Sequence, residues 1–320
     1  MHLHPGLRAL RGDDGPQRAA QHALGDALAA WRATPTQQQL ADELAHFSRG
    51  GVIEDFALLA TLFEPGDPGA AAFVHDLVGR FSAVVAKAPL GHVPLRHFTD
   101  GTVSTLMLAR AGQASLALTA IDGTRLAHRP AASSVSFAPC ETWDHVLAGE
   151  AAAELVTRDN SPGMCRKPLS LHPGAVTVRD GTRAALVMGE VTGCLVILRL
   201  QRRRSGEVTR EFSLADGALL HQAAGTGRDS RFELSAALLG RMGRRDAAPL
   251  LSAMAQEHGS AALRWQALRE CLGLDTHAGF LALCAIARSP ADPLAAPAGA
   301  LRAKLIEQHP QLAGLEPCLS

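Results

Sequence analysis

The sequence contains no tyrosine, and aromatic residues make up only 4% of the chain. Proteins that bind single-stranded nucleic acid stack its bases on aromatic side chains, so this scarcity counts against such a function. Basic and acidic residues balance at 31 each, which gives a formal net charge of zero at pH 7. Without a net positive field, we expect neither nucleic acid nor an anionic membrane surface as a partner.

Motifs of several common enzyme and metal-binding classes are also missing. The six cysteines include no CxxC pair, and no histidines occur at zinc-finger spacing. There is no GxSxG nucleophile elbow and no P-loop. Gly225-Thr226-Gly227 lacks the glycine pattern of a dinucleotide-binding loop, and we interpret it as an exposed linker. Zinc-finger, thioredoxin-like, α/β-hydrolase and nucleotide-binding functions are therefore not indicated.

Cysteine usage and the chain's beginning suggest a location. Cys194, Cys271 and Cys284 lie within apolar segments, as free cysteines do in a reducing compartment. The first residues contain no basic leader followed by an apolar stretch, and no run approaches the about 18 apolar residues of a membrane span. We expect a cytoplasmic protein without a membrane partner.

The first part of the chain has the apolar spacing of helices. Pro16 can begin a helix that ends at Thr34-Pro35, and its apolar residues recur every three or four positions. Three further helices are predicted over residues 36–47, 53–63 and 70–85. We therefore assign residues 1–87 to an N-terminal helical segment.

From about residue 88 the pattern becomes typical of strands separated by close turns. The run 194–200 is almost continuously apolar and predicts a central strand in which Leu195, Ile197 and Leu200 are all buried. The run belongs to an expected strand at 193–201, and the other expected strands are 103–110, 115–120, 133–138, 142–147, 152–158, 167–171, 175–179, 183–190 and 207–213. Because no long helical pattern lies between them, residues 88–224 are predicted to form an antiparallel β-sandwich or barrel. The run Arg202-Arg203-Arg204 is interpreted as a solvated hairpin tip.

A repeat of about 33 residues marks the C-terminal part. Ala267-Leu268-Arg269 with Leu272 recurs as Ala300-Leu301-Arg302 with Leu305. Helix pairs of this length are stacking units. Helices are expected over 232–242, 246–257, 260–273, 277–288 and 295–308. The pairs at 246–273 and 277–308 resemble HEAT-type repeats, so residues 228–320 are predicted to be a C-terminal domain of HEAT-like α-hairpins. The expected fold class is α+β.

Histidines and acidic residues are scattered through the strand region. His97 and Asp100 precede the first long strand, His145 follows Trp143-Asp144, and His172 begins a Pro-Gly turn. The element order is similar to that of the cupin superfamily, including the JmjC-like oxygenases, whose barrels hold a metal with His and carboxylate side chains. This resemblance implies a metal site of two histidines and one carboxylate, formed by His97, Asp100 and either His145 or His172, with Fe²⁺ and 2-oxoglutarate as cofactors.

The same residues also have simpler interpretations. His97 and Asp100 are three apart and would point to opposite faces of a strand, so they could instead hydrogen-bond around the loop, with Arg96 as a partner. Trp143 could line a pocket or fill the core.

Three functions follow from these alternatives. The first is a non-catalytic accessory or interaction protein that binds a protein or peptide, needs no cofactor, and uses Arg264, Trp265 and Arg302 on the C-terminal helices. The second is a cupin-type, metal-dependent non-haem iron oxygenase. The third is a small-ligand sensor that uses the barrel interior.

Overall fold

The computed structural model describes residues 10, 12–158, 163–204 and 208–315. By its internal contacts the chain divides into two compact units. The described residues up to 135, with 140–203 and 214–217, form the first unit, and residues 136–139, 204, 208–213 and 218–315 form the second. This division runs differently from the three predicted segments, because part of the predicted strand domain groups with the C-terminal helices. The predicted boundaries at 87 and 224 remain predictions.

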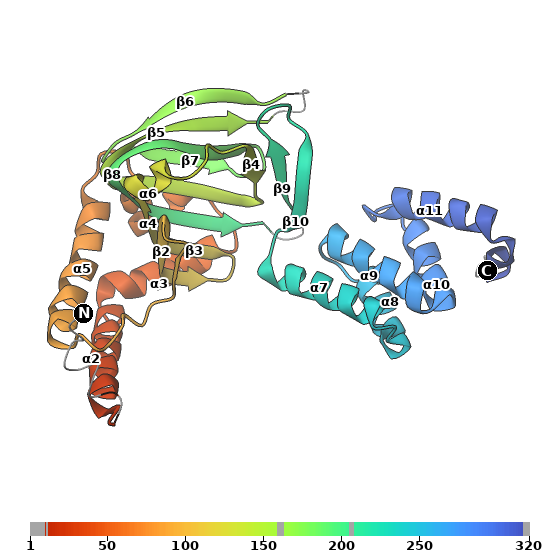
Figure 1. Cartoon of the computed structure of the whole chain (residues 1–320), viewed down its shortest axis with the longest axis horizontal. Coiled ribbons are helices and arrows are strands. Elements are labelled where there is room, and N and C mark those ends of the chain that lie inside the picture. The colour runs from red at the N-terminus through yellow and green to blue at the C-terminus, as the bar shows by residue number, and fades with distance from the viewer. Residues whose placement is uncertain (1–9, 11, 159–162, 205–207, 316–320) are drawn as a thin grey trace. The chain divides into compact units, whose positions relative to one another are not determined.

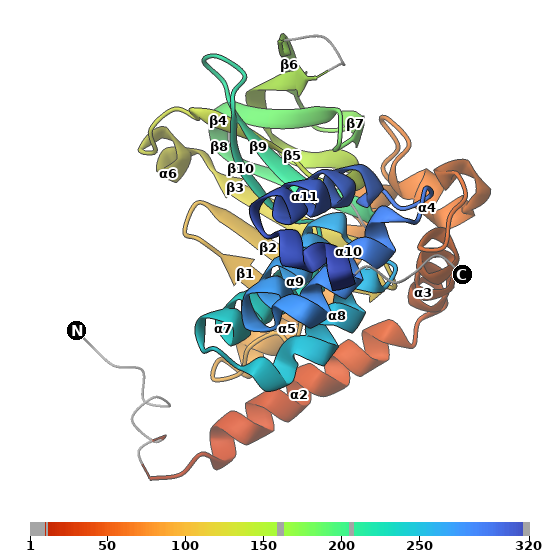
Figure 2. The same ribbon diagram turned by 90° about the vertical axis from the view of Figure 1, so that its right-hand side faces the viewer.

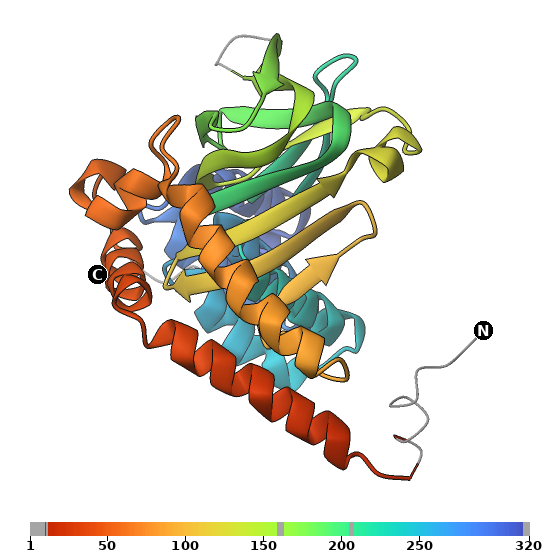
Figure 3. The same cartoon turned by 90° about the vertical axis from the view of Figure 1, so that its left-hand side faces the viewer.

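The first unit begins with the helices that the apolar spacing predicts. They are α2 (Gly15–Arg32), α3 (Pro35–Phe47), the 3-10 helix η1 (Ile53–Asp55), α4 (Ala57–Leu62) and α5 (Gly69–Lys87). Prolines occupy the first turns of α2 and α3, where no backbone N–H is needed for helix bonding. In Figure 3, α5 in orange crosses in front of the sheet, and α2 in red lies beside α5.

The helix α5 meets one criterion of a membrane span, since it is long and apolar enough by length and composition. Core helices of soluble proteins share this property, and α5 buries Phe73, Leu77 and Phe81 in the core of the first unit. An ion pair between Asp76 and Arg80 also lies along this helix. We therefore interpret α5 as a core helix, and the cytoplasmic location remains a prediction.

A seven-stranded antiparallel sheet forms the centre of the first unit (Figure 1). Its strands are β1 (His97–Thr99), β2 (Val103–Ala111), β3 (Ala114–Asp122), β5 (Cys140–Thr157), β6 (Cys165–Leu171), β7 (Val176–Asp180) and β8 (Ala184–Arg203). The order is β1-β2-β3-β8-β5-β6, and β7 pairs with β5. This confirms the α+β class and the antiparallel sheet. Among the described strands the sheet does not close into a barrel, because β1 and β6 do not pair with each other.

The two longest strands were each predicted as two shorter ones. The predicted pairs 142–147 with 152–158 and 183–190 with 193–201 are continuous in β5 and β8. The pairing register of β5 with β8 shifts around Ala148 and Glu150, which interrupts the alternation of side chains. Gly149 lies between them with φ of +80°, and a Cβ there would collide with the carbonyl oxygen of Cys194. Only glycine permits this close approach of the strands.

The core of the first unit lies on both faces of the sheet. The side chains of α2 to α5 pack with Leu200 on one face, and Leu195 and Ile197 join a second cluster with Val146 and Leu171. Leu195, Ile197 and Leu200 are all fully buried, so the prediction for this strand is confirmed. Arg202 is not solvated at a hairpin tip, because its guanidinium pairs with Glu141 and lies over the ring of Phe47.

The second unit contains the five predicted C-terminal helices (Figures 1 and 2). They are α7 (Gly227–Arg241), α8 (Ala248–Gln256), α9 (Ala261–Leu274), α10 (Thr276–Ala287) and α11 (Ala295–Gln308), with the 3-10 helices η2 (Arg245–Ala247) and η3 (Pro310–Leu315). Asp275 begins α10 by accepting a hydrogen bond from the backbone N–H of Ala278. A small sheet of order β10-β9-β4 contains β4 (Ser134–Phe137), β9 (Val208–Ser213) and β10 (Leu219–Ala224).

One local prediction is corrected at the start of α7. Gly225-Thr226-Gly227 is not an exposed linker, because Gly225 is buried and the hydroxyl of Thr226 accepts a hydrogen bond from the N–H of Asp229 at the start of α7.

In the first unit, Asp122 accepts a hydrogen bond from the backbone N–H of Arg125 and begins the short helix α6 (Gly123–Ala127), which follows β3.

Candidate functional site

The first two predicted metal ligands lie at the edge of the sheet. His97 is exposed in β1, the terminal strand. Asp100 accepts hydrogen bonds from the backbone N–H groups of Thr102 and Val103 and forms an ion pair with Arg129 at 3.1 Å. These bonds, above all those from Val103 and Thr102, lower the pKa of Asp100 to about 2. The loop interpretation of Asp100 is confirmed, except that its partner is Arg129 and not Arg96.

The other predicted ligands are engaged elsewhere. His145 is buried, and its Nδ1 lies 2.7 Å from the carbonyl oxygen of Leu62, which joins β5 to α4. His172 is exposed, and its Nδ1 lies 3.2 Å from the carbonyl oxygen of Pro173. Trp143 is a core residue whose ring packs edge-on against Phe47, with centroids 5.4 Å apart.

These positions do not make a metal site. Between β1 and β5 the sheet contains β2, β3 and β8, so His97 and His145 stand on separated strands. Within the described part of the chain, no group of three or more His, Cys, Asp or Glu side chains could hold a metal ion. The donor set that the cupin resemblance implies is therefore not assembled, and the residues do not fit an iron site. No mechanistic step is derived through iron or 2-oxoglutarate.

A buried cluster of charges lies beside His145. Asp144 is only 2% exposed, and its two carboxylate oxygens accept hydrogen bonds from Nε and Nη2 of Arg199 at 2.6 and 3.0 Å. Nη1 of Arg179 lies 2.8 Å from Oδ2 of the same carboxylate. Because β5 pairs with both β7 and β8, this cluster connects three strands of the sheet.

The chemistry of this cluster is structural. Burial alone would raise the pKa of Asp144, but the charges and hydrogen bonds of Arg199 and Arg179 together lower it below its ordinary value. The carboxylate therefore stays ionised at neutral pH and cannot donate a proton as a general acid. Buried charges are tolerated where they contact charges of opposite sign. Here the buried carboxylate contacts two arginine guanidinium groups.

The predicted partner-binding residues differ from one another in exposure. Arg264 is only 5% exposed, so the prediction that it forms an exposed surface anchor is wrong. Its guanidinium donates to the carbonyl oxygen of Ala255 and forms an ion pair with Asp292 at 2.5 Å. Trp265 is half-buried and packs against the core of the second unit, and Arg302 is half-buried. Their partner-binding role remains a prediction.

A different surface of the second unit has the character of a binding face. Leu234, Leu238 and Met242 are 71%, 56% and 58% exposed along α7. At about 100° per residue they fall within a sector of about 80° on one side of the helix. The buried residue Ala236 lies on the opposite side. The helix thus turns an apolar stripe toward solvent, which we call the α7 face.

Arginines lie at both ends of the α7 face. Arg231 precedes Leu234 by three positions and Arg241 follows Leu238 by three, so each shares its side of the helix. Arg231 and Arg241 are exposed, and neither forms an ion pair with a described residue. The sequence contained a signal for this face in the four-residue spacing of its leucines and methionine, but the same spacing is typical of a buried stripe.

Comparison with known proteins gives a limited likeness. No family model and no curated protein sequence matches the chain. Among solved structures, a 7S globulin from Momordica charantia matches 37% of this chain and 35% of its own length, with 17% identity and a TM-score of 0.27. A cupin superfamily protein from Desulfitobacterium hafniense matches 33% of this chain and 83% of its own, with 17% identity and a TM-score of 0.23. An ectoine synthase from P. lautus matches 33% and 68%, with 13% identity and a TM-score of 0.24. The chain is thus similar in part to cupin-superfamily structures, at a level that says nothing about its function.

Proposed function

We propose that this protein is a non-catalytic interaction protein whose α7 face binds an acidic amphipathic helix of a partner protein. The observation that carries this proposal is the solvent exposure of Leu234, Leu238 and Met242 on one side of a single helix. Contiguous apolar side chains exposed on a soluble domain mark interaction sites.

The arrangement of the α7 face favours a helical partner. Amphipathic helices bind by placing residues spaced three, four and seven apart on an apolar surface. Leu234 and Leu238 present the same spacing. Burial of one leucine side chain contributes about 1.5–3 kcal/mol, which offsets part of the cost of association.

The charges favour an acidic partner. Arg231 and Arg241 border the apolar stripe without forming an ion pair among the described residues. An arginine guanidinium binds a carboxylate through two parallel hydrogen bonds. Glutamates that flank the apolar side of the bound helix would therefore form ion pairs with the arginines at both ends of the α7 face.

The alternatives receive less support. An oxygenase needs a gathered set of metal ligands, whereas His97, Asp100, His145 and His172 are held apart or engaged in local hydrogen bonds. The interaction role needs no catalytic group, and the buried Asp144 cluster offers no free carboxylate for acid–base work.

A peptide of defined chemistry tests the proposal. The probe is a fluorescent synthetic helix with leucines every three or four positions and glutamates beside them, and its binding to the full chain is measured by fluorescence anisotropy. We expect saturable binding that weakens as salt screens the arginines. Leu238→Asp should lower the affinity by about tenfold or more, because it places a charge where an apolar contact forms.

Val178→Asp is the matched control, because Val178 is 62% exposed on β7 of the first unit and the same change adds the same charge there. It should leave peptide affinity unchanged. A photo-crosslinker at position 238 then identifies what covers the face in the purified protein. Crosslinks to a second copy, or to the first unit of the same chain, would show that the face is already occupied and contradict the proposal.

A further inference from the structure

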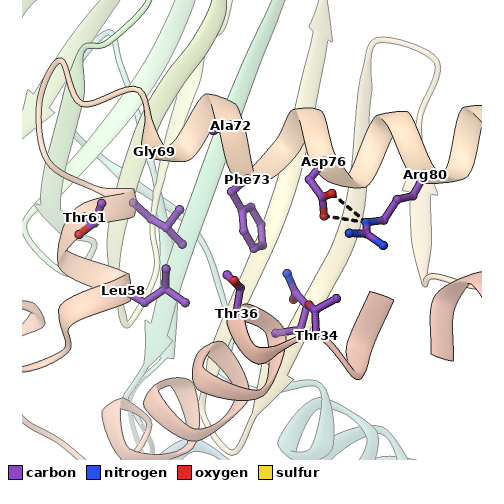
Figure 4. Close-up of a pocket in the computed structure, with 11 residues that line it drawn as sticks. Thr34, Thr36, Leu58, Thr61, Gly69, Ala72, Phe73, Asp76 and Arg80 are labelled. Atoms are coloured by element: carbon purple, nitrogen blue, oxygen red, sulfur yellow. Dashed lines mark hydrogen bonds and ion pairs between the residues drawn. The ribbon is translucent and has the colours of Figure 1, made fainter. Parts of the chain in front are cut away.

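A cavity separate from the α7 face lies among the N-terminal helices. It has a volume of about 350 Å³ and is bordered by the start of α3, by α4 and by α5. Pockets that hold small ligands begin at about this size. In Figure 4, Asp76 and Arg80 lie at one end, Leu58 and Thr61 lie at the other, and Phe73 lies between them.

The amide of Gln37 is the unusual feature of this cavity. Gln37 lines the cavity and is only 7% exposed, yet its side chain forms no hydrogen bond with a described residue. A glutamine amide has two N–H donors and a carbonyl acceptor. The amide atoms of Gln37 keep access to solvent, so they are available to a ligand that enters the cavity.

A role for Gln37 in capping α3 does not account for this. The sequence Thr34-Pro35-Thr36-Gln37 has the pattern of a capping box, in which the glutamine would bond the backbone N–H of Thr34. In the structure that N–H donates to the carbonyl oxygen of Trp31 at 3.1 Å, and the Thr34 hydroxyl donates to the same oxygen at 2.8 Å. The Gln37 amide is left to face the cavity.

The other polar groups of the cavity restrict the ligand. The hydroxyls of Thr34 and Thr61 donate hydrogen bonds to the carbonyl oxygens of Trp31 and Ala57. Because a hydroxyl has only one proton, both can act only as acceptors toward the cavity. Nε of Arg80 donates to both carboxylate oxygens of Asp76, at 2.8 and 2.9 Å, which balances the two charges. A ligand that carries an N–H or O–H donor and no net charge therefore suits these groups, and the Thr36 hydroxyl, which also lines the cavity, can donate or accept.

The apolar part of the wall consists of Leu58, Leu62, Ala72 and Phe73. From these observations we propose that the cavity binds a small uncharged molecule that carries a cyclic amide. The amide N–H and C=O would pair with the carbonyl and N–H of Gln37, and the hydrocarbon part of the ring would lie against Leu62 and Phe73. A glutamine side chain forms the same type of two-bond pairing with adenine in DNA.

The experiment uses δ-valerolactam and uracil as probes of the full chain, followed by saturation-transfer NMR. N-methylated valerolactam, which lacks the donor, and cyclohexanone, which lacks the amide nitrogen, are the ligand controls. We expect the two cyclic amides to bind and the controls to bind about tenfold more weakly or not at all. Failure of both amides to bind at millimolar concentration would contradict the proposal.

The variant Gln37→Leu separates a binding role from a structural one. It should abolish binding of both probes while the Tm of the ligand-free protein stays unchanged or rises, because no hydrogen bond of the free protein is lost. Gln38→Leu is the matched control on the next, exposed position and should bind as the wild type does. A fall in Tm for Gln37→Leu, or binding that survives this change, would show that the amide is not a ligand-binding group.

Discussion

The helices α9 and α7 of the second unit use leucine and arginine in opposite ways. In α9, Leu268 is fully buried, and Arg264 is buried with its guanidinium satisfied by Ala255 and Asp292. In α7, the stripe around Leu238 faces solvent, and the neighbouring Arg241 is exposed and forms no ion pair with a described residue. Both helices contain several leucines and at least two arginines, and the roles of these residues depend on which side of the helix packs.

This contrast distinguishes arginines that support the fold from arginines that are available to a partner. A guanidinium enclosed with its carboxylate has no donors left for another protein, whereas an exposed one beside an apolar stripe keeps its bidentate donor pattern. The two arginines of the Asp144 cluster in the first unit support the fold as Arg264 does, because both form ion pairs with one buried carboxylate.

The largest effect is expected at Arg264. Changing Arg264→Met should lower the free energy of unfolding by about 3–5 kcal/mol, because it leaves the mostly buried carboxylate of Asp292 without its counter-charge. The matched change Arg241→Met should alter it by less than about 0.5 kcal/mol. Urea denaturation of the two variants measures both changes. Equal losses in the free energy of unfolding would show that Arg264 and Arg241 do not differ in their contribution to the fold.

The leucines give the second test. Leu268→Ala in the core of the second unit should cost about 2–5 kcal/mol through lost burial and the cavity that remains. Leu238→Ala on the α7 face should change stability by less than about 0.5 kcal/mol. Thermal and urea unfolding measure both, and a loss of several kcal/mol for Leu238→Ala would show that the α7 face is packed in solution.

A smaller effect concerns pH. The hydrogen bond from Arg264 is the largest cause that lowers the pKa of Asp292 below its ordinary value, which is about 3.9 for an aspartate. A lowered folded-state pKa stabilises the protein fully above the unfolded value, and this stabilisation is lost as pH falls through the folded value. The stability difference between wild type and Arg264→Met should therefore shrink as pH falls below about 5. The stability difference between wild type and Arg241→Met should not change with pH. If it also shrank at low pH, Arg241 would have an acidic partner within the chain.

The sequence predicted the elements far better than it predicted which side of each element packs. Helix and strand bounds follow from local spacing, so α2 to α5, α7 to α11 and most strands lie where they were expected. β10 was missed, because Leu219-Leu220 is followed by a stretch without β-branched or aromatic residues. β5 and β8 were divided because the bulge at Gly149 interrupts their alternation.

The candidate sites depended on contacts between distant parts of the chain. Arg199 forms an ion pair with Asp144, which is 55 residues away in the sequence, and the ring of His145 contacts the carbonyl oxygen of Leu62, which is 83 residues away. A local sequence motif cannot predict contacts over such separations. A leucine stripe has the same spacing whether it faces the core or the solvent, so neither Arg264 nor the α7 face could be assigned correctly from periodicity. Gln37 lies in a capping-box pattern that hides its exposure to a cavity.

A charge-exchange experiment tests whether the arginines of the α7 face pair with acidic residues of a partner. The affinities of the full chain and of Arg231→Glu/Arg241→Glu are each measured for the glutamate-bearing peptide and for a matched peptide with lysines in place of its glutamates. We expect the variant to bind the acidic peptide about tenfold more weakly than the wild type and the basic peptide more tightly by a similar factor, because the charge pairs at the α7 face are exchanged. Equal affinity of wild type and variant for both peptides would contradict it.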